Sequence, residues 1–283
     1  MKLHLHAHGS TEQFSNYLKK FGKLRKSLLL EIDPTQQKFI CKSFTEDRAV
    51  VRYSDLSFAD TNLEIVKSDD IGDNRIKLGI VVTLDKIIKI LDRFDSNFDL
   101  TFNFDTLNTE NGIDYVCESV DFKSSVLKMR ITGSKITEFY HLTDEVFNER
   151  VFKVNDSVSI LANADAIHNI IKTSEIVAID PKKDSLIFYT KDNALLVKDD
   201  TGKDANGLDK EPNFEYLIAE NVTVPAYPVR IPVARDKIVN VLSDNKEDYD
   251  IILGKDVNNV VSRILFQSKQ SNTKIVISRI EEV

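Results

Sequence analysis

The sequence predicts an α+β protein made of two similar domains, each with two helices packed on antiparallel sheets. Three observations predict this class: the length, an internal repeat, and amphipathic helices spaced regularly between strand-like segments. The 283 residues suffice for two domains of about 140 residues, which is a common domain size. We expect domains over residues 1–132 and 156–283, joined by a connector over 133–155.

The internal repeat has two parts. Residues 85–102 align without a gap with residues 236–253, at an offset of 151, and both stretches read as a short helix followed by a strand. An Ile-Asp-Pro tripeptide at 32–34 recurs at 179–181, at an offset of 147. Because two stretches recur in the same order, we interpret the chain as a duplication of one domain.

Four segments carry apolar residues at three- and four-residue spacing, which predicts helices over 12–26, 83–94, 163–175 and 233–243. Asn163 is placed to cap the third of them. Between the helices, runs such as KFICKSF and TKIVISR alternate with period two, which predicts strands. Each domain is therefore expected to hold two helices, each followed by strands.

A search for catalytic motifs finds none. The chain has no GxSxG, HExxH or CxxC pattern and no glycine-rich phosphate loop, so we expect neither an enzyme nor a required cofactor. Two cysteines, Cys41 and Cys117, exclude a disulfide framework and favour a reducing cytoplasm. No apolar run is long enough to span a membrane.

Three histidines near the N-terminus form a possible exception. His4, His6 and His8 alternate, so an extended strand would present all three on one face, where they could bind a metal. A solvated strand, or residues left over from expression, explains the same pattern. The sequence leaves these readings open.

The distribution of charge is more informative than the net charge of −7. The four predicted helices carry eleven cations and six anions, a net charge of +5, so the rest of the chain carries −12. On the first two helices the cations lie opposite the apolar stripe. This arrangement predicts a basic outward face, mainly in the first domain, although a solvated helix face is also often rich in lysine.

A helix followed by strands, twice per domain in a duplicated chain, resembles the DNA sliding clamps. The segments KSLLLEI, VVTLDKIIKILDRFDSNFDLTF and YDIILG with TKIVISRI are similar to clamp segments, the N-terminal part to those of tailed phages. The resemblance implies the DNA-clamp fold and a non-enzymatic processivity factor of viral origin, acting in the host cytoplasm. It also implies a homotrimeric ring around double-stranded DNA, with a DNA polymerase and an ATP-dependent clamp loader as partners.

The resemblance also implies two sets of functional residues. The expected DNA-binding residues, which contact the backbone without reading bases, are Lys19, Lys20, Lys23, Lys26, Lys86, Lys89, Arg93, Lys172 and Lys237. The expected partner-binding residues, within the connector, are Phe139, Tyr140, Leu142, Val146 and Phe147, for which packing is the alternative role.

Two other functions are compatible with the sequence. One is a β-rich viral structural protein built by the same duplication, which would need no basic helical face. The other is a monomeric polymerase accessory protein that binds DNA by charge without forming a ring.

Overall fold

The computed structural model divides the chain into two compact units, which are described separately. Unit 1 comprises residues 1–44 and 52–143, and unit 2 comprises residues 45–51 and 144–283. The structure describes all residues except 25, 26, 82, 83, 94–96, 110, 111, 140, 141, 181–183, 203, 204, 207–209, 224, 226, 244, 245 and 281–283. The division does not test whether 133–155 acts as a connector, which stays a prediction.

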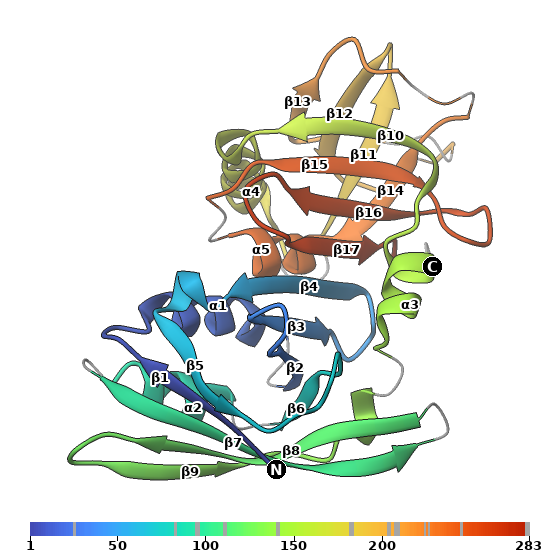
Figure 1. Cartoon of the computed structure of the whole chain (residues 1–283). Coiled ribbons are helices and arrows are strands. Elements are labelled where there is room, and N and C mark those ends of the chain that lie inside the picture. The colour runs from blue at the N-terminus through green and yellow to red at the C-terminus, as the bar shows by residue number, and fades with distance from the viewer. Residues whose placement is uncertain are drawn as a thin grey trace. The chain divides into compact units, whose positions relative to one another are not determined.

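Unit 1 contains two runs of mostly antiparallel strands (Figure 1). The first has the order β4-β3-β2-β6, with β4 at Val50–Ser57, β3 at Lys38–Phe44, β2 at Ser27–Asp33 and β6 at Ile76–Val81. The second has the order β9-β8-β7-β1-β5, with β9 at Lys128–Thr132, β8 at Gly112–Lys123, β7 at Phe98–Thr109, β1 at Lys2–Ala7 and β5 at Leu63–Ser68. A short parallel pairing of β6 with β8 joins the two runs.

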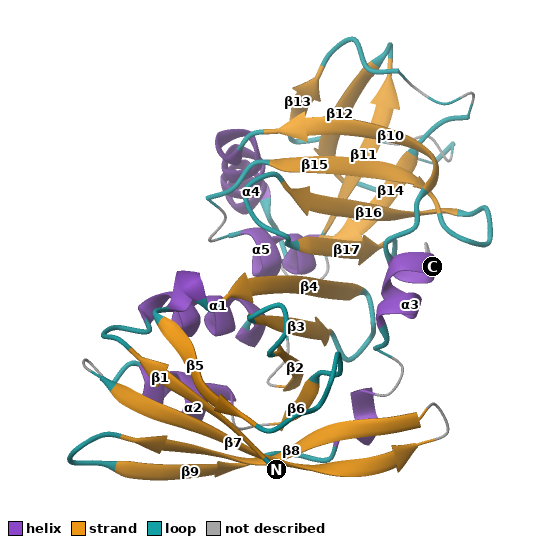
Figure 2. Ribbon diagram, in the orientation of Figure 1, coloured by secondary structure: helices purple, strands orange, loops and turns teal. Residues whose placement is uncertain are grey.

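Unit 2 contains one four-stranded sheet and a second run of four strands (Figure 2). The first has the order β13-β12-β11-β14, with β13 at Glu215–Ala219, β12 at Ala194–Asp199, β11 at Ser185–Lys191 and β14 at Arg230–Ala234. The second has the order β10-β15-β16-β17, with β10 at Asn155–Ala162, β15 at Tyr249–Lys255, β16 at Val261–Ser268 and β17 at Lys274–Ser278. Short helical turns lie at Ala59–Thr61, Ile136–Phe139, Asp144–Val146 (α3) and Phe147–Val151.

Each unit also contains one pair of longer helices, as the sequence predicted. Unit 1 has α1 at Glu12–Gly22 and α2 at Leu84–Leu91, and unit 2 has α4 at Ala164–Val177 and α5 at Arg235–Leu242. The first helix ends at Gly22, earlier than the expected residue 26, and glycine is among the residues least favourable in a helix. The predicted cap of α4 is confirmed, since Asn163 Oδ1 accepts a hydrogen bond from the Ala166 backbone N–H at 2.8 Å.

The sheet orders confirm the predicted duplication. Strands β4-β3-β2-β6 and β9-β8-β7-β1 of unit 1 correspond to β13-β12-β11-β14 and β17-β16-β15-β10 of unit 2. The 151-residue offset is confirmed as well, because α2 and α5 begin 151 residues apart, at Leu84 and Arg235.

The Ile-Asp-Pro match, in contrast, does not reflect the duplication. Its first copy ends β2, whereas Ile179 and Asp180 follow α4 and precede β11, which is the counterpart of β2. A short motif of this kind suits any point where a strand or helix gives way to a turn, because proline fixes its own backbone and restricts the residue before it. The motif therefore recurs without marking equivalent positions.

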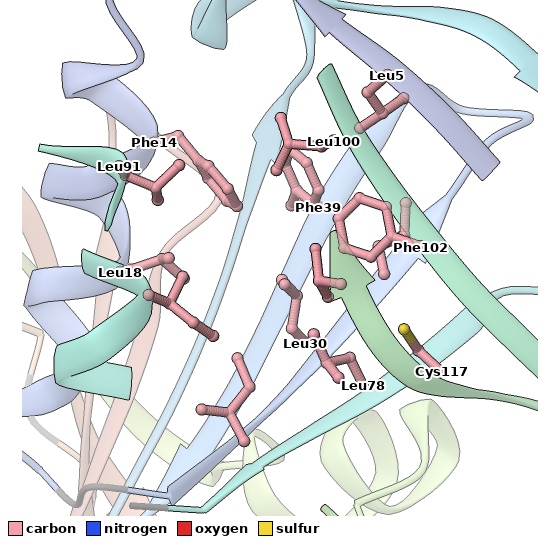
Figure 3. Close-up of a cluster of buried hydrophobic side chains, with 14 of the residues drawn as sticks. Leu5, Phe14, Leu18, Leu30, Phe39, Leu78, Leu91, Leu100, Phe102 and Cys117 are labelled. Atoms are coloured by element: carbon pink, nitrogen blue, oxygen red, sulfur yellow. The ribbon is translucent and has the colours of Figure 1, made fainter. Parts of the chain in front are cut away.

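The core of unit 1 lies between its helices and its strands. Phe14 and Leu18 of α1 and Leu91 of α2 face Phe39 of β3 and Leu100 of β7, and all five side chains are buried (Figure 3). The Phe14 and Phe39 rings stack with their centroids 4.3 Å apart. Burial of such side chains contributes roughly 1.5–3 kcal/mol each, so the apolar stripes fix which helix faces remain outside.

The core of unit 2 follows the same arrangement. Side chains from both helices and from both sheets surround a void of only about 10 Å³: Ile167, Ile170, Ile171, Phe188, Ile238, Leu242, Ile251 and Phe266. The small void indicates close packing, which again leaves the opposite helix faces to solvent. No helix among the described residues is long and apolar enough to cross a membrane.

A basic helix pair as the candidate DNA interface

Helix α1 presents its lysines on the side opposite its buried stripe. Phe14, Tyr17, Leu18 and Phe21 are buried, whereas the predicted residues Lys19, Lys20 and Lys23 are all exposed. The predicted residue Lys26 lies outside the described residues. The sequence therefore predicted the outward face of this helix correctly as far as the structure describes it.

Two buried side chains hold α1 on the strands beneath it. The Tyr17 hydroxyl donates a hydrogen bond to the Ser54 carbonyl at 2.6 Å and accepts one from the Cys41 backbone N–H at 3.0 Å. Burial raises the pKa of Tyr17 well above its usual value, so the hydroxyl stays protonated and remains a donor. Arg52 Nη1 donates to the Lys20 carbonyl at 3.0 Å, at the end of the helix where a cation is favoured.

Helix α2 places its cations in the same way. Leu84, Ile87, Ile88 and Leu91 are buried, whereas Lys86, Lys89 and Arg93 are exposed. Among the described residues, none of these three cations makes an ion pair. Their charges are therefore available to a ligand outside the chain.

One carboxylate connects the two helices. Asp92, directly after α2, accepts a hydrogen bond from the Ser15 hydroxyl of α1 at 2.5 Å and pairs with Lys19 Nζ at 3.0 Å. The hydrogen bond from Ser15, together with Lys19, lowers the pKa of Asp92, so the carboxylate is ionised at neutral pH. Lys19 is thus an exposed cation with a partner inside the chain.

Unit 1 therefore presents a predominantly positive helix surface. Among the described residues, six exposed cations lie on or next to its two helices: Lys19, Lys20, Lys23, Lys86, Lys89 and Arg93. Three exposed anions, Glu12, Asp85 and Asp92, lie there as well, which leaves a net charge of +3 on this surface. In a chain of net charge −7, such a surface is a local positive region that attracts anionic groups such as phosphates.

The helices of unit 2 are less basic. Lys172 is exposed on α4, together with Asp165 and Glu175. Lys237 of α5 is only 22% exposed, and its Nζ lies 2.6 Å from Asp47 Oδ2. The sequence could not reveal that pair, because Asp47 is 190 positions away in a turn.

The predicted partner-binding residues have mixed positions. Phe139, Leu142 and Phe147 are buried and Val146 is half-buried, whereas Tyr140 lies outside the described residues. The buried residues thus pack against this chain, which is the alternative that the sequence left open. Their role in partner binding stays a prediction.

A buried lysine that sequence analysis missed forms a hydrogen bond with the segment that carries Leu142. Lys42 Nζ donates to both carboxylate oxygens of Glu31 at 3.0 Å and to the Leu142 carbonyl at 3.1 Å. Arg75 Nη1 donates to the same carboxylate at 3.1 Å. Strands β2 and β3 pair Leu29 with Lys42 and Glu31 with Ile40, so Lys42 and Glu31 are diagonal neighbours. Their opposite charges on two predicted strands were the available signal.

The three N-terminal histidines lie as the alternation predicted. Leu3, Leu5 and Ala7 are fully buried, and the histidines between and after them point the other way. His6 Nδ1 lies 2.8 Å from Asp99 Oδ1, and His8 Nε2 lies 2.7 Å from Glu64 Oε1. No group of three metal-ligating side chains occurs in the part of the chain that the structure describes.

Solved structures of sliding clamps resemble this chain over its whole length. A PCNA2–PCNA3 complex from Sulfolobus tokodaii has a TM-score of 0.57 at 12% identity, with 100% of both chains covered. PCNA of A. fulgidus, bound to the C-terminal region of FEN-1, has a TM-score of 0.61 at 11% identity, with 99% of this chain and 100% of that chain covered.

A bacterial clamp gives a similar result. The Helicobacter pylori beta clamp, bound to a DNA ligase peptide, has a TM-score of 0.61 at 10% identity. The match covers 98% of the present chain and 66% of the beta clamp chain. No protein-family model and no curated protein sequence matches this chain. At these identities the similarity establishes the α+β DNA-clamp fold, which confirms the fold predicted from the sequence.

Proposed function

We propose that the chain is the subunit of a sliding clamp, which closes with further copies into a ring around duplex DNA and tethers a DNA polymerase. The observation that carries this proposal is the surface of net charge +3 on α1 and α2, in an otherwise acidic chain of clamp fold. Lysine and arginine contacts to phosphates bind DNA without sequence preference, as sliding requires. The structures that resemble this chain are named as clamps, two of them with bound partner peptides or regions.

Two strand edges support closure of a ring by copies of the chain. Within the described residues, β9 pairs only with β8 and β13 pairs only with β12. Unpaired edges of this kind tend to pair with another chain. Pairing of two different edges between copies is a head-to-tail contact, which generates a ring where the rotation closes.

The charges and apolar side chains of these edges are complementary. Strand β9 carries Lys128 and Arg130, whereas β13 begins at Glu215 and is followed by Glu220. Exposed apolar side chains lie on both edges, Met129 on β9 and Leu217 on β13. We therefore assign the contact between subunits to β9 of one copy and β13 of the next, and expect a trimer.

The remaining parts of the proposal concern partners and source. The polymerase and an ATP-dependent loader would dock on the segment 133–155, with Phe139, Tyr140, Leu142, Val146 and Phe147 as the candidate residues. The resemblance of the N-terminal segments to phage clamps supports a viral origin and action in the host cytoplasm. The chain itself would supply no catalysis.

One experiment tests the central claim. The purified protein is examined by native mass spectrometry and negative-stain microscopy, and its effect on product length is measured in polymerase assays on circular and linear templates. Because a closed ring without a loader reaches DNA only by threading over a free end, a trimeric ring that extends products on linear but not on circular templates is the expected result. A protein that stays a 32.2 kDa monomer at high concentration would contradict the ring, and would favour the monomeric accessory protein.

A further inference from the structure

The carboxylate of Asp92 occupies an unusual place on the basic surface of unit 1. It follows directly on the last residue of α2, Leu91, where the helix dipole disfavours an anion. It nevertheless lies against α1, held by the hydroxyl of Ser15 at 2.5 Å, and Ser15 is fully buried. The hydrogen bond from a fully buried residue therefore fixes the position of the Asp92 carboxylate.

The ion pair that Asp92 makes with Lys19 is, in contrast, easily broken. The Lys19 and Asp92 side chains are 45% and 42% exposed, and Nζ lies 3.0 and 3.1 Å from the two carboxylate oxygens. Exposed pairs contribute little to stability, because water screens them and long side chains lose freedom in them. Lys19 can thus leave Asp92 for a phosphate at small cost, while Ser15 keeps the carboxylate in place.

We propose that the Asp92 carboxylate competes with DNA phosphates for Lys19. This competition weakens DNA binding by the helix pair and keeps the protein mobile on DNA. This inference rests on the proposed function and adds a regulator to the same surface. Each time Lys19 binds a phosphate it gives up a fixed carboxylate, so the contact gains less than that of a lysine without a partner. Such an exchange suits a surface that must bind DNA and still move along it.

Three cations of the same surface lack such a competitor. Lys86, Lys89 and Arg93 have no ion pair among the described residues, so they bind phosphate without giving up a partner. Asp85 is the matched case for comparison, because it is exposed on α2 and has no ion pair in the described part of the chain. Removing its charge changes the net charge of the surface equally, but frees no lysine.

The test compares Asp92→Asn with Asp85→Asn. Asparagine keeps the size of Asp92 and an oxygen that accepts the Ser15 hydrogen bond, but it releases Lys19. Affinity for a labelled duplex is measured by fluorescence anisotropy at several salt concentrations, with thermal unfolding as a check on the fold. One additional phosphate contact steepens the log–log salt dependence by about 0.9, which corresponds to about eightfold tighter binding at roughly 0.1 M salt.

The proposal requires Asp92→Asn to steepen the slope by up to this amount, and to lose the gain when Lys19→Ala is added. Asp85→Asn should tighten binding less and leave the slope near that of the wild type. Equal effects of the two variants, or a gain that survives Lys19→Ala, would overturn the role of Asp92 and leave the clamp proposal intact. A wild-type protein that binds no duplex even at low salt would instead refute the proposed function, and this inference with it.

Discussion

Lys237 and Asp47 form an ion pair in which Nζ lies 2.6 Å from Oδ2, between α5 and the turn at residues 45–49. The Thr45 hydroxyl and the Ala49 backbone N–H donate to Oδ1 of the same carboxylate at 2.5 and 3.0 Å. Partial burial alone would raise the pKa of Asp47, but these hydrogen bonds and the lysine outweigh it and lower the pKa to about 2. Lys237, one of the expected DNA-binding residues, thus has a partner within unit 2, and its role in DNA binding stays a prediction.

The pair predicts a stability effect with a defined pH dependence. Because the folded pKa of Asp47 is below its ordinary value of 3.8, the contribution is present above about pH 4 and is lost as the pH falls toward 2. Asp47 is 51% exposed, so solvent screening limits the effect to about 1 kcal/mol. Asp47→Asn should therefore lower the free energy of unfolding at pH 7, and the difference from wild type should shrink near pH 2.

Denaturant unfolding of both proteins at several pH values measures this difference. Asp165→Asn is the matched control, since Asp165 is exposed on α4 and makes no ion pair within the described residues. A difference for Asp47→Asn that is equally large at pH 2 and pH 7 would mean that its charge is not the cause.

Local periodicity accounts for most of what the sequence predicted correctly. The apolar residues of α1 recur every three or four positions, so both the helix and its exposed lysines follow from one pattern. The offset of 151 residues in the repeat likewise located α5 from α2. Both the periodicity and the repeat are patterns within the sequence, so they can be recognised without knowledge of the folded structure.

The contacts of individual charges could not be predicted in this way. Lys19 and Asp92 are 73 residues apart, and Lys42 and Leu142 are 100 apart, so only the folded chain brings them together. The false Ile-Asp-Pro match shows the same limit, because a turn motif carries no information on which strands pair. Sequence therefore located the basic surface and its carboxylates, but not which lysine pairs with which carboxylate.

The buried pair of Lys42 and Glu31 predicts a large effect on unit 1. Their side chains are 1% and 5% exposed, so replacement of Lys42 by methionine leaves a buried carboxylate without its nearest cation. Loss of one partner of a buried pair costs about 3–5 kcal/mol, and Arg75 places the expected loss at the lower end. Hydrogen exchange should also speed up around Leu142, whose carbonyl loses its donor.

Two further variants distinguish the stability cost of an unpaired buried charge from the cost of lost side-chain packing. The double variant Lys42→Met/Glu31→Met should be more stable than Lys42→Met alone, since no charge of the pair is then left buried. Lys38→Met, on the same strand but 23% exposed, should cost less. A double variant no more stable than the single one would show that the lysine stem, and not its charge, matters.

The edges of β9 and β13 predict a charge-dependent assembly. Lys128→Glu places an acid on β9 opposite the glutamates of β13, so repulsion should shift the protein toward monomers. Glu215→Lys should do the same from the other side. Combining the two changes restores opposite charges and should recover part of the assembly, as measured by analytical ultracentrifugation at low and high salt. If all three variants assemble as the wild type does, β9 and β13 do not form the contact between subunits.

The basic surface itself predicts the strongest effect on DNA. In the variant Lys19/Lys23/Lys86/Lys89→Ala, each lost phosphate contact should reduce the log–log salt slope of binding by about 0.9, and sequence preference should not change. The fold should survive, because changes at exposed positions usually alter stability by less than about 0.5 kcal/mol.

A second variant removes the same charge from exposed lysines elsewhere: Lys67, Lys191, Lys210 and Lys246, each replaced by alanine. Its net charge equals that of the first variant, so a general effect of charge would lower DNA binding equally in both. Duplex affinity and polymerase product length, each measured at several salt concentrations, distinguish the two. If the helix variant stays folded and assembled yet binds and supports synthesis as well as this control at every salt concentration, α1 and α2 are ordinary solvated helices. A loss confined to the helix variant would instead locate the DNA contact on unit 1.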